Sequence, residues 1–400
     1  MEKTKILKDV SFITTVFNEE KSVLLFLESL VSQTLMPEEI VVVDGGSSDN
    51  TLNLIIEYFS KTSSSSSLKN KTSINGEVYY GKVSYRKDNS FHGVYNPDKS
   101  HAASYVSEKL VFEAFLACGT GVKIFYAPCT KISQGRNIAV KNSSGKFICV
   151  SDGGCRLKPN WLYEITKYYF SKFIKKTGEY DVDVTGGYNL PYIKKFLHAV
   201  LSMCILPKKS EIDKRKFMPS SRNISFKRQV WETVGGFPEY MDYGEDMKFN
   251  FNIKKSGYKI EFNPDAEVYW NLRDNLQAVF KQFFRYAKGD AVGRMYLYRH
   301  IIRFLSFFVF LIIVAVSAVL SPWYLLLLVP LLIFYSYRPY SRINSVLSNS
   351  KNTEFIKDSK SLKIFKTIFI SILSIPLFLL YIDIAKLSGY IYGLALRKKY

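Results

Sequence analysis

Two aspartates stand at the ends of short apolar runs and have neighbours that suit phosphate chemistry. Asp44 follows the run EIVVV, where its carboxylate could accept a hydrogen bond from the imide nitrogen of a uracil-like base. Asp152 precedes Gly153 and Gly154, and glycines would let a diphosphate approach the backbone closely. A divalent ion, magnesium or manganese, could be held there by the carboxylate and phosphate oxygens, because both ions take hard oxygen ligands.

A third aspartate, Asp246, opens a predicted helix in the segment GEDMKFNF, directly after Glu245. A carboxylate in this place could accept a proton from an incoming alcohol. It could equally serve only as a helix cap, which is the more common role of an isolated acidic pair at a helix start.

The elements that must position these residues alternate between strands and helices. Apolar, β-branched runs predict strands, and apolar spacing of three and four predicts the helices between them, at residues 10–17 (strand), 24–31 (helix), 39–43 (strand), 51–59 (helix), 122–126 (strand), 131–142 (helix) and 146–150 (strand). This order predicts an α/β fold with a mostly parallel, Rossmann-like sheet flanked by helices. Ligands of such sheets bind beyond the carboxyl ends of the strands, where Asn18, Asp44 and Asp152 fall.

The composition points to a membrane rather than to nucleic acid. The formal charge of +20 is spread along the chain and becomes denser mainly around apolar C-terminal runs, as expected for a surface that meets anionic lipid. Five cysteines, an odd number without C-x-x-C spacing, indicate neither a disulfide framework nor a zinc site. The N-terminus shows no apolar leader, so we expect the N-terminal domain to stay in the cytosol.

Two C-terminal regions are apolar enough to enter a bilayer. Residues 304–337 carry no charge and would form a helix of roughly 50 Å, longer than a hydrocarbon core of about 30 Å. Two short spans turning near Pro322 fit better, with basic residues placing both ends in the cytoplasm. A second apolar region, 364–396, must cross twice or dip back at Pro376 if its basic end is also inside. We therefore expect a multi-pass protein of the cell membrane, with a transmembrane region over 304–400.

Two further segments interrupt the regular pattern. Residues 61–121 form an insertion, rich in serine and then in tyrosine, that could be a disordered decoration or a lid contacting an acceptor. Residues 273–303 contain an amphipathic helix, which could lie at the membrane interface or pack its apolar stripe against the domain.

Five ordered blocks between Val10 and Gly293 resemble family 2 glycosyltransferases, which have the GT-A fold. The blocks are FITTVFNEE, VVVDGGSSDNT, QGRNIAVKNSSGKFICVSDGGC, SSRNISFKRQVWETVGGFPE and GEDMKFNFNIKKSGYKIEFNPDAEVYW. The resemblance implies a GT-A domain over residues 1–272, followed by the interfacial and transmembrane regions.

The same resemblance assigns roles to individual residues. It implies that Asp246 is the catalytic base and that Asp152 is the surviving metal ligand. The nucleotide-sugar would be bound by Thr15, Asn18, Glu19, Asp44, Arg136, Asp152 and Gly153, and the acceptor side would include Glu245, Trp270, Gln282, Arg285 and Tyr286. The last three belong to QFFRY, which resembles the QxxRW element of processive members.

Two departures from the family pattern weaken this transfer of roles. The second aspartate of the metal motif is Gly154, so an ion must find another ligand, bind mostly through phosphate and water, or be dispensable. Trp270 stands where many members have a histidine. It could stack on a sugar or lipid, although a core tryptophan is the commoner case.

We therefore expect an inverting glycosyltransferase that moves a sugar from a UDP- or GDP-sugar to a lipid-linked or other membrane-held glycan acceptor, without nucleic acid as a partner. A processive polysaccharide synthase is one alternative, although the few C-terminal spans look insufficient for a translocation channel. A non-catalytic nucleotide-sugar binder is another, and a binder would need no proton acceptor such as Asp246.

Overall fold

The chain divides into two compact units. The computed structural model describes residues 5–63, 72–74, 77–79, 108–170, 182–349 and 361–397. Unit 1 comprises Met1–Thr185 and Ser221–Phe237, and unit 2 comprises Gly186–Ser220 and Pro238–Tyr400.

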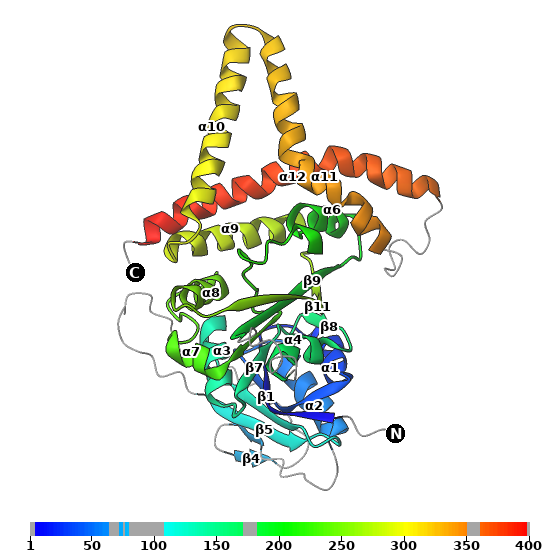
Figure 1. The fold of residues 1–400 in the computed structure, drawn as a ribbon, viewed down its shortest axis with the longest axis vertical. Helices are drawn as coiled ribbons and strands as arrows, with labels where there is room; N and C mark the ends of the chain where they lie inside the picture. The colour runs from blue at the N-terminus through cyan, green and yellow to red at the C-terminus, as the bar shows by residue number, and fades with distance from the viewer. Residues whose placement is uncertain are drawn as a thin grey trace, which may run out of the picture. The chain divides into compact units, whose positions relative to one another are not determined.

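Unit 1 is built on a mixed sheet, with strands in the order β5-β6-β2-β1-β7-β10 (Figure 1). The strands are β1 (Lys5–Val16), β2 (Leu35–Asp44), β5 (Lys109–Phe115), β6 (Gly121–Tyr126), β7 (Phe147–Val150) and β10 (Ile224–Lys227). The central strands β6, β2, β1 and β7 are parallel, whereas β5 and β10 run antiparallel to their neighbours. All four predicted strands are present and form this parallel centre, so the predicted α/β fold is confirmed.

Helices flank the sheet and complete the core of unit 1. They are α1 (Val23–Val31), α2 (Thr51–Thr62), α3 (Ile132–Lys141), α4 (Trp161–Phe170) and α7 (Arg228–Thr233), with a short strand β8 (Cys155–Leu157) before α4. The rings of Phe26 and Trp161 lie 6.1 and 5.8 Å from the ring of Phe12, all three fully buried. These aromatic contacts fix α1 and α4 against the central strand.

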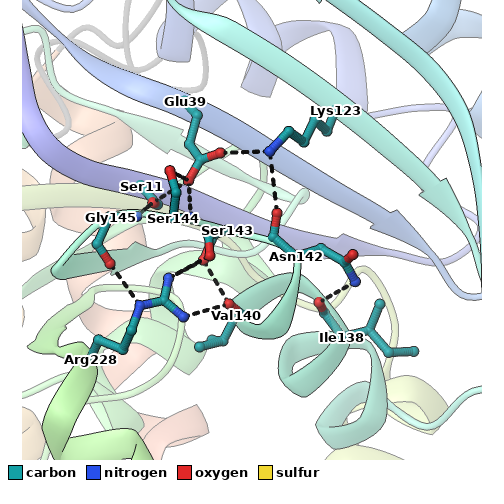
Figure 2. A network of polar contacts seen from close by, with 10 residues as sticks. All are labelled: Ser11, Glu39, Lys123, Ile138, Val140, Asn142, Ser143, Ser144, Gly145 and Arg228. Atoms are coloured by element: carbon teal, nitrogen blue, oxygen red, sulfur yellow. Dashed lines mark hydrogen bonds and ion pairs between the residues drawn. The ribbon is translucent and has the colours of Figure 1, made fainter.

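A buried polar network closes the edge of this sheet where the central strands begin (Figure 2). Glu39 accepts hydrogen bonds from the hydroxyls of Ser11 (2.7 Å) and Ser144 (2.8 Å) and from the ammonium of Lys123 (3.1 Å). Arg228 donates to the carbonyls of three residues after or at the end of α3, at 2.8–2.9 Å: Val140, Ser143 and Gly145. The network therefore joins β1, β2, β6, α3 and α7 at their polar ends.

Part of the predicted insertion, residues 61–121, belongs to regular structure. Strand β5 pairs with β6, and β3 (Thr72–Ile74) pairs with β4 (Glu77–Tyr79). Most of the tyrosines that suggested a lid, such as Tyr85 and Tyr95, lie outside the described residues.

Unit 2 combines two neighbouring strands with a set of helices. Its elements are β9 (Val184–Tyr192, which starts at the end of unit 1), α6 (Phe196–Ile205), η1 (Lys209–Glu211), α8 (Glu245–Lys255), β11 (Ile260–Asn271), α9 (Leu276–Val292), α10 (Leu297–Val319), η2 (Pro322–Leu327), α11 (Leu328–Asn349) and α12 (Ser361–Leu396). The C-terminal half of α11 is fixed to the α6 region, because Arg342 bonds Glu211 (2.8 Å) and the carbonyl of Met203 (2.9 Å).

The predicted hairpin in residues 304–337 is formed by α10 and α11, which Figure 1 shows as two legs joined through η2. Among the described residues, two helices are long and apolar enough to cross a membrane: Leu297–Val319, with mean hydropathy 2.6, and Ile370–Leu396, with 1.9. Length and composition alone support this, and the first helix is almost entirely unburied.

Candidate active site

The carboxyl ends of the central strands in unit 1 lie side by side. In the parallel register, Val16 of β1 lies opposite Asp44 of β2, and Asp44 lies opposite Tyr126 of β6. On the other side of β1, Ile13 lies opposite Val150 of β7. The loops that follow these strands, which carry most of the predicted nucleotide-binding residues, therefore start along one edge.

Asp44 is fully buried and only partly satisfied. Its Oδ1 accepts hydrogen bonds from the backbone N–H groups of Gly46 (2.8 Å) and Ser47 (2.7 Å). Its Oδ2 is buried and has no hydrogen-bond partner in the described part of the chain. Burial raises the pKa of this carboxyl although the hydrogen bonds from Ser47 oppose the shift. Such an oxygen can accept a hydrogen bond from an N–H group of a ligand.

The loop after β1 is tied to the loop after β2. Asn18 adopts a left-handed φ of 54° and accepts a hydrogen bond at Oδ1 from the backbone N–H of Ser48 (2.8 Å). Its own N–H donates to the hydroxyl of Ser47 (2.9 Å), and the N–H of Glu19 donates to the hydroxyl of Thr51 (2.7 Å). These bonds bring the predicted residues Asn18, Glu19 and Asp44 into one compact pair of loops.

Helix α3 supplies a cation to the same edge. The guanidinium of Arg136 contacts Asp152 at 2.9 Å and lies 5.5 Å from the ring centroid of Phe237. Position 135 must be small, because a Cβ on Gly135 would lie 2.9 Å from a methyl group of Thr15. The close approach of α3 to β1 thus places Arg136, whose side chain is buried, beside the partly exposed carboxylate of Asp152.

In unit 2, Asp246 lies in the first turn of α8. The helix follows Gly244, which has a left-handed φ of 75°, and the Oδ1 of Asp246 accepts a hydrogen bond from the N–H of Met247 at 2.8 Å. Gly244 occupies the N-cap position, and the helix start has no side-chain capping bond in the described part of the chain, so Asp246 is not the cap of α8. Glu245 is buried, whereas Asp246 is half-buried.

The QFFRY segment of α9 packs against the loop that precedes α8. The Arg285 guanidinium lies 5.1 Å from the ring centroid of Tyr243, and Lys288 forms an ion pair with Asp242 at 3.2 Å. A Cβ on Gly289 would lie 2.2 Å from the carbonyl oxygen of Tyr243, so only glycine permits this contact.

Within the same segment, Gln282 is buried and donates from Nε2 to the hydroxyl of Tyr286 at 2.8 Å. Its Oε1 has no hydrogen-bond partner among the residues that the structure describes. The predicted acceptor-side residues Glu245, Gln282, Arg285 and Tyr286 thus belong to two segments that pack against each other.

Two regions of the sequence match glycosyltransferase families. Residues 11–72 match the family described as "Glycosyl transferase family 2", and residues 203–337 match "Glycosyl transferase family group 2". Both matches are to models of family 2 glycosyltransferases, the family that the sequence blocks resemble. The mixed sheet with its flanking helices agrees with the α/β fold expected from the sequence.

Two curated proteins resemble this chain over part of their length. Glycosyltransferase AglE of Haloferax volcanii is 27% identical over 39% of this chain and 49% of its own. Succinoglycan biosynthesis protein ExoA of Rhizobium meliloti is 29% identical over 16% of this chain and 19% of its own. The matches thus span half or less of each relative.

Solved structures of glycosyltransferases resemble the fold at low identity. Mannosyltransferase PcManGT of Pyrobaculum calidifontis, solved with GDP-Man and Mn2+, has a TM-score of 0.47 and 13% identity, covering 98% of this chain and 87% of that one. TarS of S. aureus (residues 1–349), solved with UDP-GlcNAc, has a TM-score of 0.44 and 13% identity, covering 98% and 92%.

The donor set for a divalent ion in the described part of this chain is small. In the described ranges, no group of three or more histidine, cysteine, aspartate or glutamate side chains is arranged to hold a metal. A Cβ at Gly154 would lie 3.3 Å from a carboxylate oxygen of Glu19, so Glu19 fills the space beside Asp152 that a residue at 154 would enter. Magnesium is commonly held by one or two carboxylates together with substrate phosphates, and this donor set fits that mode.

Trp270, predicted on the acceptor side, is partly buried and packs against a core cluster of unit 2 that includes Leu201, Leu272 and Val279. Its ring thus contributes to packing, as a core tryptophan does. The acceptor-side role of Trp270 stays a prediction.

Several residues that shape the site were not found from the sequence. Asn137, next to Arg136, donates to the carbonyl of Phe237 (2.8 Å) and accepts from the N–H of Phe237 (2.9 Å) and the indole of Trp231 (3.0 Å), so it fixes the loop that carries Phe237. The ring of Tyr243 also contacts the Arg285 guanidinium. Two sequence features could have indicated this contact: Tyr243 directly precedes the GED segment, and a glycine follows Arg285 four residues later.

Proposed function

We propose that this chain is an inverting glycosyltransferase that moves a sugar from a nucleoside-diphosphate sugar to a membrane-held acceptor. The observation that carries the proposal is the buried Oδ2 of Asp44, which has no hydrogen-bond partner in the described part of the chain. It lies at the sheet edge that also holds the Arg136–Asp152 pair. A base N–H would satisfy Asp44, and the diphosphate would lie toward Arg136.

Each predicted residue then has a role. Thr15, Asn18 and Glu19 surround the nucleoside with Asp44, and the backbone of Gly153, where a Cβ would lie 2.7 Å from a methyl carbon of Val16, binds the diphosphate. The cation of Arg136 stabilises the negative charge that grows on the departing diphosphate. A divalent ion bound through Asp152, with Glu19 as a possible second carboxylate, would supply further positive charge to the leaving group.

The reaction is a direct displacement at the anomeric carbon. The acceptor hydroxyl oxygen forms the new bond, Asp246 takes the hydroxyl proton, and the bond to the diphosphate breaks with its electron pair leaving on oxygen. One base suffices and the configuration inverts. The QFFRY residues Gln282, Arg285 and Tyr286, together with Glu245, form the acceptor side.

The α10–α11 hairpin supports a membrane location. Helix α10 is about 34 Å long at 1.5 Å per residue, enough for a hydrocarbon core of about 30 Å. The tip carries Trp323 and Tyr324, residue types that favour the membrane–water interface. Arg303 and Arg338 border the uncharged run, and basic residues at both ends favour a cytoplasmic base.

The test uses the full chain purified in detergent, with UDP- and GDP-sugars and a membrane extract as acceptor. We expect nucleoside diphosphate release that requires the extract. Asp246→Asn should lower turnover about 100- to 10,000-fold with donor binding retained, because it removes only the proton acceptor. Asp265→Asn, the same exchange at a mostly exposed carboxylate of β11, is the matched control.

Three outcomes would separate the alternatives. Undiminished turnover by Asp246→Asn would refute the assigned base. Donor binding without diphosphate release under any acceptor condition would favour a non-catalytic binder. A ladder of long products from one acceptor would favour a processive synthase.

A further inference from the structure

Helix α12 packs against the rest of unit 2 through one narrow face of small and apolar residues. That face is formed by residues three, four and seven positions apart: Ser371, Ile375, Ile382, Ala385, Gly389 and Gly393. A Cβ on Gly389 would lie 2.1 Å from the backbone oxygen of Phe284, and one on Gly393 would lie 2.7 Å from that of Lys288. Backbone contact of this kind fixes α12 directly on α9.

The opposite face of α12 is apolar and exposed along most of its length. It is lined by Ile370, Leu373, Leu377, Ile384, Ile391 and Leu394, which again follow helical spacing. The charged residues of this stretch, Asp383 and Lys386, lie on a different side, where Asp383 bonds Arg303 of α10 and Lys386 covers the ring of Phe283. The exposed face is therefore an uncharged apolar strip of about 36 Å, by the rise of a helix from residue 370 to 394.

By length and composition α12 qualifies as a membrane span, but its packing argues against a crossing. Helix α9 lies along it: the hydroxyl of Tyr381 donates to the carbonyl of Leu276 (3.0 Å), and the rings of Phe284 and Tyr392 lie 5.7 Å apart. Along its length α9 carries four charges, at Lys281, Arg285, Lys288 and Asp290. A crossing α12 would take them into hydrocarbon, at about 2.5–3.5 kcal/mol for each charge near the centre.

The α10–α11 hairpin defines where the hydrocarbon begins. Helix α10 meets α12 through Arg303 and Asp383 (2.7 Å) and through the stacked rings of His300 and Tyr390 (3.9 Å). Beyond Arg303 the hairpin is uncharged up to Tyr337. Figure 1 shows α12 (orange to red) running across the base of the hairpin, at the level where α10 and α11 leave the other helices of unit 2.

We propose that α12 lies flat in the membrane–water interface, with its exposed apolar strip in the lipid and α9 on the aqueous side. The lipid is the occupant that fits, because α12 meets the base of the uncharged hairpin through the contacts of Arg303 and His300, and the basic run RKK directly follows α12 in the sequence. Among the described helices, the α10–α11 hairpin alone then crosses the bilayer, and the QFFRY helix α9 is held parallel to the membrane surface.

This inference rests on the membrane anchoring in the proposed function, so the experiment tests the two separately. Single spin labels are placed on α12 at Ile384 and Ile391, which are both exposed and seven positions apart. A second pair on α10, at Leu305 near the base of the hairpin and Ile312 near the middle of the uncharged run, has the same separation. Cys118, Cys129 and Cys204 are replaced by serine, and depth in lipid nanodiscs is measured by power saturation with oxygen and a nickel chelate.

The two pairs should behave differently. Along a crossing helix, seven residues between the interface and the middle of the bilayer correspond to about 10 Å of depth, so the α10 labels should differ by about that much. The α12 labels should lie at equal, shallow depth within a few ångström. A difference near 10 Å on α12, or aqueous exposure of both its labels, would overturn the proposal.

The remaining outcomes separate the proposals. If the α10 labels also read as aqueous, the anchoring itself fails and the placement of α12 fails with it. Transfer activity of each labelled protein is measured in parallel, so that loss of the catalytic function would appear as loss of diphosphate release without a change in either depth pair.

Discussion

The two edges of the parallel strands in unit 1 differ in how completely their buried carboxyl groups are hydrogen-bonded. At the edge where the strands begin, Glu39 accepts hydrogen bonds from two serines and a lysine, and Arg228 donates to backbone carbonyls beside it (Figure 2). At the edge where they end, Asp44 is just as buried but keeps one oxygen without a hydrogen-bond partner in the described part of the chain. A buried polar network whose hydrogen bonds are all made stabilises the fold. A buried acceptor that lacks a hydrogen-bond donor is instead typical of a site where a ligand supplies the donor.

The pKa shifts of the two carboxyls have opposite signs for the same reason. Burial alone would raise both. At Glu39 the hydrogen bonds from Ser144, Ser11 and Lys123 outweigh burial, and the pKa is lowered from its ordinary value of 4.5. At Asp44 burial outweighs the bonds from Ser47 and Gly46, and the pKa is raised from 3.8. The ionised Glu39 therefore stabilises the folded state, whereas the ionised Asp44 destabilises it.

The largest effect is expected from Glu39→Gln. The amide cannot neutralise Lys123 and places an N–H₂ group among donors, so the free energy of unfolding should fall by about 2–3 kcal/mol. Thermal unfolding of the protein in detergent would show this as a lower midpoint, with donor affinity retained per folded molecule.

Its matched control is the neighbouring exchange Glu38→Gln. Glu38 pairs with Lys8 at the surface, with 39% of its side chain exposed, so its loss should cost less than about 1 kcal/mol. Equal midpoints for the two variants would show that the network around Glu39 does not stabilise the fold.

At the other edge, Asp44→Asn should leave stability unchanged or improve it while donor binding is lost. The amide oxygen can still accept from Gly46 and Ser47, and the uncompensated buried charge disappears. Affinity for the nucleoside diphosphate should fall about 10- to 150-fold, the equivalent of about 1.5–3 kcal/mol for a hydrogen bond to a charged group. Titration calorimetry with UDP and GDP measures it.

Asp49→Asn, in the same loop, serves as the control for the Asp44 variant. Asp49 bonds Thr51 within the protein and has no predicted donor contact. If both variants bind the nucleotide equally well, Asp44 does not contact the base.

The dependence of stability on pH should separate the two carboxyls further. A lowered pKa contributes stability above the unfolded value, so the deficit of Glu39→Gln should be full above about pH 4.5 and disappear as the pH falls through the lowered folded pKa. A raised pKa works in the other direction, so any gain of Asp44→Asn should appear only as the pH rises above 3.8 and through the raised folded pKa. Thermal midpoints of both variants and the parent chain between pH 3 and pH 8 test the signs, and parallel curves would contradict them.

The sequence predicted one of these edges much better than the other. The buried strands β1, β2, β6 and β7 are marked by apolar, β-branched runs, and the polar residues after them fall at the carboxyl edge by topology alone. The polar network at the opposite edge could not be predicted from the sequence. Glu39 is bonded there by Ser144 and Lys123, which follow no periodic pattern and come from distant segments. The edge strand β5 was also missed, since it lies at the end of a long irregular segment.

The membrane region shows a similar limit. Hydropathy counts apolar residues but does not tell which of them are covered, so α10 and α12 look alike in the sequence. The structure distinguishes the two helices by their packing. Gly389 and Gly393 let α12 pack closely against α9, which carries charged residues, whereas only 6% of the apolar window of α10 is buried. The sequence also left open whether residues 364–396 turn at Pro376, and the structure has one uninterrupted helix there.

The smallest effect is expected at Gly154, where the carboxyl edge departs from the family pattern. Gly154→Ala introduces a Cβ 3.3 Å from the Glu19 carboxylate, and a small shift of that side chain should hold the loss of unfolding free energy below about 0.5 kcal/mol.

Gly154→Asp adds a second carboxylate at this point and should lower the free energy of unfolding by about 1 kcal/mol more without added metal, because like charges repel in a partly buried site. Glu19→Gln should relieve this cost, giving a coupling of about 0.5–1 kcal/mol in a double-mutant cycle of thermal stability. Strict additivity of the two changes would mean that Glu19 does not occupy the place of the missing aspartate, and a second ligand for the ion would then have to come from the substrate alone.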